Sequence, residues 1–354
     1  MILWYNQLID KLEVILHFLR GENMKDYNYY KTIADICNER NDIYKKFKVE
    51  EIIPLNKISL SREPDEGNSF LLKSGEEKYL MIETSTSFYW VSSRCMLYDI
   101  NNVEGNFAKY LHDYDQEDHN GERHTLFVFS YIDGEPLKDY LSKLDKVEAY
   151  NLGLEFSKTL KNVHLVPVNF LTHHIPHWYD AYKWTQKALI NSTSNGVIEK
   201  ALNYYKENED IIYNRYSSAE YYNKINGNYV RDENGNIVVE KVLAFIFRDV
   251  RFENLVVKNN KVFIKCPINI YISDPFYEFK YLSLIALENE YFASGIIDGY
   301  FEGKISKDFF KMLKYYTSEL IINEYNKTLD DEIINKIYDS YDDFRLEIPK
   351  WYHR

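Results

Sequence analysis

Two side chains near the middle of the chain have the types and spacing that phosphoryl transfer requires. Asp249 follows an apolar run that ends at Phe247, and Asn254 comes five residues after Asp249. In a loop of this kind, the aspartate accepts the proton of a substrate hydroxyl and the asparagine binds a metal ion on ATP. Two apolar runs, Leu255–Val257 and Val262–Ile264, follow as a hairpin. The stretch therefore predicts a catalytic loop, with Asp249 as base and Asn254 as a metal ligand.

Each of these two residues also has an ordinary structural interpretation. A loop aspartate often serves only to hydrogen-bond nearby backbone groups. Asparagine is common at a turn before a strand. The spacing leaves both interpretations open, so the elements around the loop have to decide between them.

Composition and charge limit the function classes. The chain has 354 residues, of which 45% are hydrophobic and 16% aromatic, enough for a sizeable core. Its 43 lysines and arginines against 55 acidic residues give a net charge of −12. Binding to a nucleic-acid backbone depends on clustered cations. We therefore expect no nucleic-acid partner.

The cysteines and the N-terminal segment indicate where the protein works. Cys37, Cys95 and Cys266 are odd in number and show no CxxC spacing, which is typical of a reducing compartment without disulfides. Met1–Leu19 is apolar but carries interrupting charges, as an amphipathic helix does and a signal peptide does not. No run of about 18 uncharged apolar residues is present, so we expect no membrane span and a cytoplasmic protein.

The hydrophobic pattern predicts a small sheet after a helical start. Residues 1–49 are expected to form a helical extension, and residues 50–131 a sheet with one helix. That helix is expected from about Asn101 to His112, with Glu104 on one face. The expected strands are Ile52–Leu55, Ser69–Leu72, Lys78–Ile82 and Thr125–Tyr131.

The rest of the chain, residues 132–354, has mostly helical periodicity. A turn at Ile132–Leu137 is followed by a long amphipathic helix from about Val147 to His164. Further helices are expected at 306–325 and 329–346.

Four segments, taken in order, resemble motifs of the aminoglycoside phosphotransferase and choline kinase family, a branch of the protein-kinase-like fold. LFVFSYIDGEPLKDYL is similar to the hinge between the lobes, and LGLEFSKTLKNVH to the helix that ends in a histidine before the substrate region. FRDVRFENLVV resembles the family's HGDxHxxN loop. DPFYEF, followed by YFASGIIDGYFEGKISKDFFKMLKYY, resembles the helical C-terminal part of one bacterial subgroup. The resemblance covers roughly residues 50–325.

The resemblance implies an α+β fold of two lobes, with ATP and Mg²⁺ as possible cofactors. Residues 50–131 would be the N-lobe, a small antiparallel sheet with one helix, and residues 132–354 a larger, mostly helical C-lobe. The adenine edge would meet main-chain groups of Ser130, Tyr131 and Ile132. Glu104 would be the helix glutamate near the nucleotide phosphates.

The chain departs from the family pattern at the phosphate-binding lysine. Alignment of KYLMIE with the family's third strand places Ile82 at the position of a lysine that pairs with the nucleotide phosphates. Lys73 and Lys78 lie nearby and could substitute for it, or could be ordinary surface lysines. The phosphate clamp is therefore expected to be missing or displaced.

A second departure concerns the metal-binding aspartate after the hairpin. Anchoring on DPFYEF places Cys266 at that position, and a thiol is a poor ligand for Mg²⁺, which prefers carboxylate oxygens. In the alternative alignment Asp274 is the metal ligand. Asp274 before Pro275 is also an ordinary helix N-terminus. We favour the alignment with Cys266 and keep Asp274 as the candidate metal ligand.

A third departure lies in the loop, where the family's His-Gly is Phe247-Arg248. Loss of fixed charges around the phosphates raises the barrier to transfer. We therefore expect a catalytically impaired, pseudokinase-like protein that acts as a binding or scaffold subunit for a peptide or partner protein. The alternative is an active ATP- and Mg²⁺-dependent phosphotransferase. It would act on a hydroxyl of a peptide or of a small aminoglycoside- or choline-like molecule, with Asp249 as base.

Two further patterns each leave an alternative open. His173, His174 and His177 could form a metal site, although the pattern favours a polar loop. The aromatic residues of segment 178–222 could line a groove for a sugar or an extended peptide, or could pack between helices.

Overall fold

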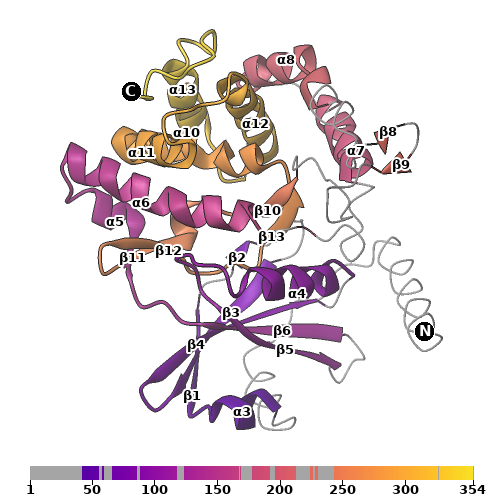
Figure 1. Ribbon diagram of the computed structural model, residues 1–354, viewed down its shortest axis with the longest axis vertical. Coiled ribbons are helices and arrows are strands. Elements are labelled where there is room, and N and C mark those ends of the chain that lie inside the picture. The colour runs from indigo at the N-terminus through magenta and orange to yellow at the C-terminus, as the bar shows by residue number, and fades with distance from the viewer. Residues whose placement is uncertain are drawn as a thin grey trace. The chain divides into compact units, whose positions relative to one another are not determined.

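The computed structural model describes residues 42–55, 58–59, 66–85, 88–117, 123–166, 168, 178–191, 196–212, 224–225, 228–229, 243–325 and 327–353. The chain divides into two compact units. Unit 1 comprises residues 1–101 and 108–131, and unit 2 comprises residues 102–107 and 132–354 (Figure 1). Unit 1 is built on an antiparallel sheet and unit 2 is mostly helical, so the protein has an α+β fold. Nearly all of the expected extension, residues 1–49, lies outside the described residues.

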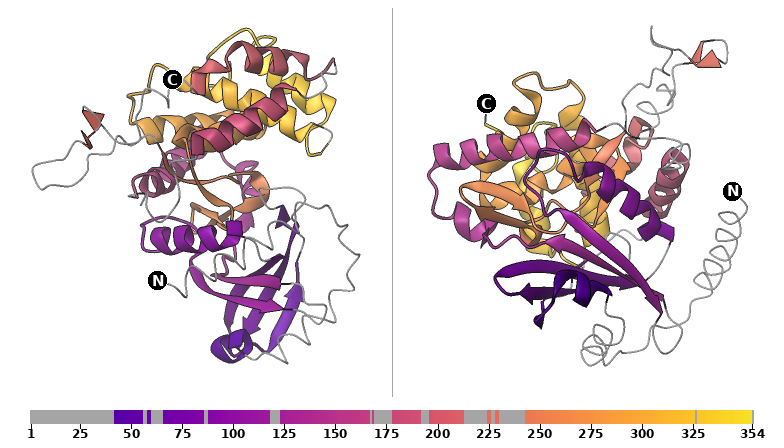
Figure 2. Two further views of the ribbon diagram at one scale, coloured as in Figure 1. Left: turned by 90° about the vertical axis from the view of Figure 1, so that its right-hand side faces the viewer. Right: turned by 60° about the horizontal axis from the view of Figure 1, so that its bottom comes forward.

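The sheet of unit 1 has the strand order β1-β3-β4-β6-β5, and β2 also pairs with β3. All pairs are antiparallel, and the strands form one twisted sheet (Figure 2). Gly75, with a φ of 57°, allows the tight turn between β3 and β4. The strand bounds are Glu51–Pro54 for β1, Ile58–Ser59 for β2, Glu66–Ser74 for β3, Glu77–Ser85 for β4, Tyr110–Glu117 for β5 and Arg123–Ser130 for β6. The four expected strands are confirmed as β1, β3, β4 and β6.

Alternating residues of these strands form the core on one sheet face. Because side chains alternate along a strand, every second residue reaches the same face. Helix α3, Asp42–Phe47, and the residues after it contribute to that core. The buried core residues are Ile43, Val49, Phe70, Leu72, Met81, Leu126 and Val128.

The helix expected at 101–112 is wrong. The helix of unit 1 is α4, Phe88–Ile100, and it is followed by strand β5. The side chain of Asn101 accepts the main-chain N–H of Tyr110 and donates to its carbonyl, both at 2.9 Å. These bonds join the end of α4 to the start of β5. The chain therefore turns where the sequence pattern predicted a helix.

Unit 2 is organised on α6, Lys146–His164, which confirms the expected long helix. Asp145 caps its N-terminus and forms a capping box with Glu148. Helix α11, Glu290–Phe301, packs directly on α6 (Figure 1). The contact is close because glycines lie in it: a Cβ added at Gly295 would lie 2.2 Å from the carbonyl oxygen of Tyr150.

The other elements of unit 2 surround this pair of helices. Its small sheets have the orders β10-β13, β12-β11-β7 and β8-β9. No helix in the described part of the chain is long and apolar enough to cross a membrane. The bounds are β7 Glu135–Pro136, α5 Leu137–Leu141, α7 Trp178–Ile190, α8 Glu199–Glu207, β8 Lys224–Ile225, β9 Asn228–Tyr229, β10 Ala244–Phe247, η2 Phe252–Asn254, β11 Leu255–Lys258, β12 Lys261–Ile264, β13 Ile270–Ser273, η3 Pro275–Tyr281, α10 Leu282–Glu288, α12 Phe309–Glu324 and α13 Asp331–Ser340.

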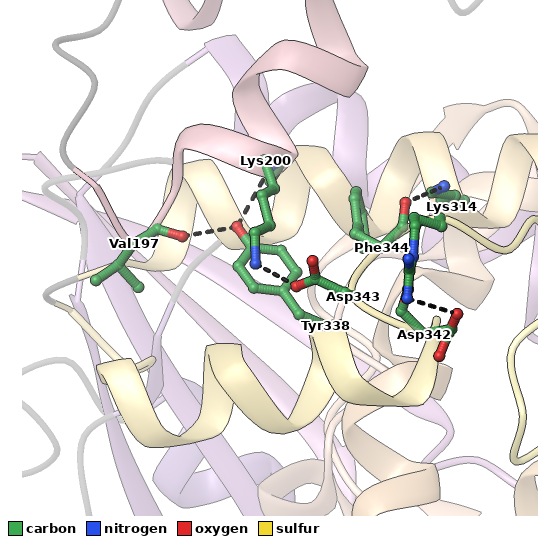
Figure 3. Close-up of polar contacts among 9 residues, drawn as sticks. Val197, Lys200, Lys314, Tyr338, Asp342, Asp343 and Phe344 are labelled. Atoms are coloured by element: carbon green, nitrogen blue, oxygen red, sulfur yellow. Dashed lines mark hydrogen bonds and ion pairs between the residues drawn. The ribbon is translucent and has the colours of Figure 1, made fainter.

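Helix α13 and the turn after it fix helices α8 and α12 (Figure 3). The carbonyl of Phe344 accepts a hydrogen bond from the buried Lys314 of α12 at 2.6 Å. The hydroxyl of Tyr338 donates to the carbonyl of Val197, just before α8, at 2.8 Å. Residues 342–344 all have φ between 53° and 64°, a conformation that non-glycine residues adopt only when their surroundings hold it.

Candidate functional site

The predicted catalytic loop directly follows strand β10, which lies in the core of unit 2. All four of its residues are buried, and it pairs with β13. The main-chain N–H of Arg248 donates to the carbonyl of Asn269 at 3.1 Å, so the loop begins in a fixed position. The hairpin after the loop is confirmed as β11 and β12. Asn259 and Asn260, both with positive φ, form its turn.

A buried carboxylate, Glu278 of η3, holds the start of the loop. Its Oε1 accepts the main-chain N–H of Phe247 at 2.5 Å, and its Oε2 lies 2.5 Å from Nε2 of His164, at the end of α6. Burial raises the pKa of the Glu278 carboxyl. Sequence reasoning assigned no role to Glu278, although it is the glutamate of DPFYEF. It joins three elements: β10, η3 and α6.

The predicted base, Asp249, lies at the edge of the buried region. Its carboxylate is paired with the guanidinium of Arg251, and the two side chains are 15% and 20% exposed. Burial alone would lower the pKa of Arg251, but the charge of Asp249 raises it. The main-chain carbonyl of Asp249 accepts a hydrogen bond from Asn254 at 2.9 Å. The structure thus places Asp249 on a partly exposed loop, with a cation as its partner.

Asn254 is buried and uses its amide to hold the backbone. Its Nδ2 donates to the carbonyls of Asp249 and Cys266, each at 2.9 Å. Its Oδ1 accepts the N–H of Cys266, also at 2.9 Å. The side chain therefore links the loop to the residue that follows the hairpin.

The side chains at two candidate metal positions near the loop, Cys266 and Asp274, are buried. Burial raises the pKa of the Cys266 thiol to about 12, so it stays protonated and is no ligand for a hard ion. Asp274, fully buried, accepts the N–H of Phe276 at 2.9 Å and the hydroxyl of Tyr316 at 3.0 Å. Among the residues described, no group of three or more His, Cys, Asp or Glu side chains could hold a metal ion. The metal roles of Asn254 and Asp274 stay predictions.

The residues expected near the nucleotide lie mainly in unit 1. Ile82 of β4 is fully buried. The N–H of Ser130 donates to the carbonyl of Lys109 at 2.8 Å, and that of Tyr131 to the carbonyl of Lys78 at 3.3 Å. Ile132 begins the main part of unit 2. Recognition of adenine by Ser130, Tyr131 and Ile132 stays a prediction, and two of the three N–H donors already have partners within the sheet.

Glu104 and Lys73 lie elsewhere than the nucleotide hypothesis expected. Glu104 is exposed in the irregular segment 102–107, which belongs to unit 2, and only its carbonyl accepts a bond that the structure describes, from Asn162 at 2.9 Å. Its role beside the nucleotide stays a prediction. Glu104 does not lie on a helix, because α4 ends at Ile100. Lys73 pairs with Glu51 on the neighbouring strand at 2.8 Å, as a surface lysine does.

Three cations and two tyrosine rings lie around the loop, and we call them the cation–tyrosine cluster: Arg248, Arg251, Lys280, Tyr277 and Tyr281. Lys280 Nζ lies 4.1 Å from the ring centre of Tyr277 and 5.0 Å from that of Tyr281. Arg248 Cζ lies 5.9 Å from the Tyr277 ring, and Arg251 Cζ lies 5.7 Å from the Tyr281 ring. Lys280 thus shares one tyrosine ring with each of the two arginines. Sequence reasoning missed it, although a lysine in the apolar run FKYLSL is a signal.

Next to the cluster, the carboxylate of Glu319 in α12 accepts hydrogen bonds from three tyrosine hydroxyls. It accepts the hydroxyls of Tyr277 at 2.9 Å, Tyr182 at 2.7 Å and Tyr205 at 3.4 Å. Tyr205 is fully buried and stacks on Tyr315, so here the aromatic residues pack between helices.

Most of the expected aromatic groove and the three histidines of the candidate metal site lie outside the described side chains. The remaining aromatic side chains of the expected groove, Trp178, Tyr179, Trp184, Tyr213, Tyr216, Tyr221 and Tyr222, lie outside the described side chains, as do His173, His174 and His177.

Comparison with known proteins identifies the fold. No protein-family model and no curated protein matches the chain by sequence. The structure is similar to amicoumacin kinase hAmiN in complex with AMP-PNP, Ca²⁺ and Ami, with a TM-score of 0.55 and 10% identity over 90% of this chain and 98% of that one. It is also similar to the ternary complex of streptomycin, ATP and APH(2")-IIa, with a TM-score of 0.51 and 15% identity over 94% and 100% of the chains.

A third solved structure, the GDP complex of aminoglycoside 2'-phosphotransferase-IIIa, has a TM-score of 0.52 and 12% identity over 88% of this chain and 97% of that one. Identities this low show the fold and nothing finer. The chain has the protein-kinase-like fold of the aminoglycoside phosphotransferases.

Proposed function

We propose that the chain is a ligand-binding protein of this fold in which Mg²⁺-dependent phosphoryl transfer is impaired. The observation that carries the proposal is the contact between Asn254 and Cys266. The amide expected to face a metal holds backbone, and the residue aligned with the metal aspartate is a buried neutral thiol. Neither of these two side chains supplies a carboxylate to a hard cation.

The missing lysine supports the same proposal. Catalysis of phosphoryl transfer is mostly positioning and electrostatic stabilisation, so each lost fixed charge adds about 3 kcal/mol or more to the barrier. Ile82 contributes no charge, and Lys73 is engaged on the sheet surface. We infer that two of the charges on which transfer depends are lost together.

The task of such a protein would be binding. We propose that it works in the cytoplasm as a binding or scaffold subunit for a peptide or partner protein. The loop supports binding because Glu278, Asn254 and the β10–β13 pair hold it in a defined conformation.

The test is a phosphotransfer assay with ATP and Mg²⁺ on streptomycin, gentamicin, choline and a serine-containing peptide. We expect no phosphorylation that depends on Asp249, so the wild type and Asp249→Ala should give the same background. Thermal melting with ATP, with and without Mg²⁺, should show no metal-dependent shift. A ligand at a hundred times its Kd adds about 2.7 kcal/mol, which moves the midpoint by several degrees.

The second candidate function is an active phosphotransferase with Asp249 as the base for a substrate hydroxyl. The observation that favours it is the partial exposure of the Asp249 side chain on a braced loop. The same assay decides between the two. Phosphorylation abolished by Asp249→Ala, with an unchanged melting midpoint, would overturn the first proposal and support the second.

A further inference from the structure

Asp249, the predicted base, has a cationic partner within its own loop. Its carboxylate is paired with the guanidinium of Arg251, two residues further along the chain. The side chains of Asp249 and Arg251 are 15% and 20% exposed, so solvent screens the pair only in part. An arginine keeps its proton in proteins, and the carboxylate therefore faces a permanent positive charge.

The backbone at both residues is held by Asn254. Its side chain donates to the carbonyl of Asp249 at 2.9 Å, and its main-chain N–H donates to the carbonyl of Arg251 at 3.0 Å. Because one residue holds both carbonyls, the two side chains start from fixed positions on the same loop. The pair differs in this respect from an ion pair between two freely moving surface side chains, which contributes little.

Groups outside the loop also stabilise the guanidinium beside Asp249. Arg251 Cζ lies 5.7 Å from the ring centre of Tyr281, a buried residue of η3. A guanidinium near an aromatic face is attracted to it. Burial alone would lower the pKa of Arg251, but the charges of Asp249 and, to a smaller extent, Glu324 of α12 raise it. Arg251 is therefore stabilised by η3 and α12 as well as by its neighbour in the loop.

We propose that Arg251 forms an autoinhibitory contact, which withholds the carboxylate of Asp249 from a substrate hydroxyl. This inference rests on the proposed function, because it names a second cause of impaired transfer within the same loop. A base must accept a proton, and a proton on Asp249 would leave the largely buried guanidinium without its countercharge. A ligand hydroxyl that approaches Asp249 also has to compete with a charge-assisted contact. Removal of the charge of Arg251 therefore releases Asp249.

The experiment is carboxyl labelling of the full chain with a water-soluble carbodiimide and glycine ethyl ester. The carbodiimide activates a protonated carboxyl group, and the amine then displaces the urea and leaves an amide, which mass spectrometry of proteolytic peptides detects. Arg251→Gln should raise the labelling rate of Asp249 by about 10-fold or more, because an adjacent opposite charge favours the unprotonated carboxylate by such a factor. The rate at Glu332, which is 76% exposed, is the internal reference.

Two further variants separate the effect of charge from that of structure. Arg251→Lys keeps the charge, so it should protect Asp249 better than Arg251→Gln does. Arg345→Gln is the matched control, because it removes the same charge from a side chain that is 72% exposed and pairs with Asp342. It should label at Asp249 as the wild type does.

Folding of each variant is checked by its melting profile. Arg251→Met, which keeps an unbranched side chain beside Tyr281, is made in parallel, so that a folding defect in Arg251→Gln leaves the comparison intact. Equal labelling rates of Asp249 in the wild type and in a well-folded variant without the charge would overturn the inference. Equal rates in Arg251→Lys and Arg251→Gln would overturn it as well, since charge would then not be the cause.

The outcome is separable from that of the proposed function, because labelling requires no transfer. Faster labelling of Arg251→Gln together with Asp249-dependent phosphorylation by the wild type would reject the impaired function and keep the inhibitory contact. No phosphorylation and equal labelling would keep the proposed function and reject this inference.

Discussion

The side chain of Asn254 bonds to both main-chain polar groups of Cys266, accepting its N–H and donating to its carbonyl at 2.9 Å each. A third bond, to the carbonyl of Asp249, ties the loop to the same side chain. One amide thus determines the distance between the predicted base and the position after the hairpin. This makes Asn254 a structural residue whatever else it binds.

Replacement of Asn254 by alanine should destabilise the protein by about 2–4 kcal/mol, because buried backbone groups would lose their partners. Urea unfolding measures the change. Asn162→Ala, which removes one bond to the carbonyl of Glu104 near the surface, is the control and should cost much less. Equal stabilities of the wild type and Asn254→Ala would contradict the structural role.

The two described cysteines should differ in reactivity. Cys95 is exposed, whereas burial raises the pKa of Cys266 to about 12. The thiolate is the reactive form, so iodoacetamide at pH 8 should alkylate Cys95 and leave Cys266 unmodified until urea is added. Mass spectrometry of the tryptic peptides separates the sites. Equal rates in the folded protein would show that Cys266 is not buried as described.

Loss of the buried carboxylate at position 278 should be severe. Glu278→Ala removes the partner of His164 and of the Phe247 N–H, and we expect a loss of about 3–5 kcal/mol. Glu302→Ala is the matched control, because Glu302 pairs with Lys161 at the surface and should change stability little. Similar midpoints for the two variants in urea would rule out the bracing role.

The stability contributed by Lys280 should depend on pH. Its folded-state pKa of about 7 lies below the value of about 10.4 for an unfolded lysine. Between these values the unfolded state binds more protons, so stability rises with pH across that window. Lys280→Met should therefore be the more stable form near pH 6.5, and its advantage should shrink toward pH 9.5. The charged groups facing Lys280 are Arg248, Asp249, Glu319 and Glu324.

Unfolding curves of both proteins at the two pH values provide the measurement. A difference between the wild type and Lys280→Met that is constant from pH 6.5 to 9.5 would mean that the amine keeps an ordinary pKa.

Close packing of α6 and α11 makes a further prediction. A Cβ at Gly295 would meet the carbonyl oxygen of Tyr150 at 2.2 Å, so Gly295→Ala must push the helices apart. Overpacking of this kind costs about 1–3 kcal/mol or more. Gly196→Ala, where no atom lies within 4 Å of the added Cβ, should be neutral or slightly stabilising. Thermal melting of the two variants gives the comparison, and equal midpoints would show that the helices are farther apart than described.

Local patterns determined much of this protein. Short apolar runs bounded by turn residues predicted β1, β3, β4 and β6, and the 3.6-residue period predicted α6. The position of the loop also followed from local order, since an apolar strand, Asp249, Asn254 and a hairpin occur within 22 residues, from 243 to 264.

Helix α4 and strand β5 could not be predicted in this way. The residues of α4 are aromatic, β-branched and polar in no clean period, and the bonds that turn the chain at Asn101 are made to Tyr110, nine residues away. The sequence pattern therefore placed Glu104 on a helix, whereas α4 ends at Ile100 and Glu104 follows it.

The sequence by itself determined the α+β fold and the place of the catalytic-like loop, and the family resemblance predicts a loss of charge at Ile82 and Cys266. Only the tertiary structure decided what the retained residues do. It brought Lys280 and Arg248 to the same tyrosine ring, and it bound Asn254 to Cys266 and Glu278 to His164. The physical reason is that these contacts join residues 12 to 114 positions apart, so their charge and hydrogen bonding depend on how distant elements pack.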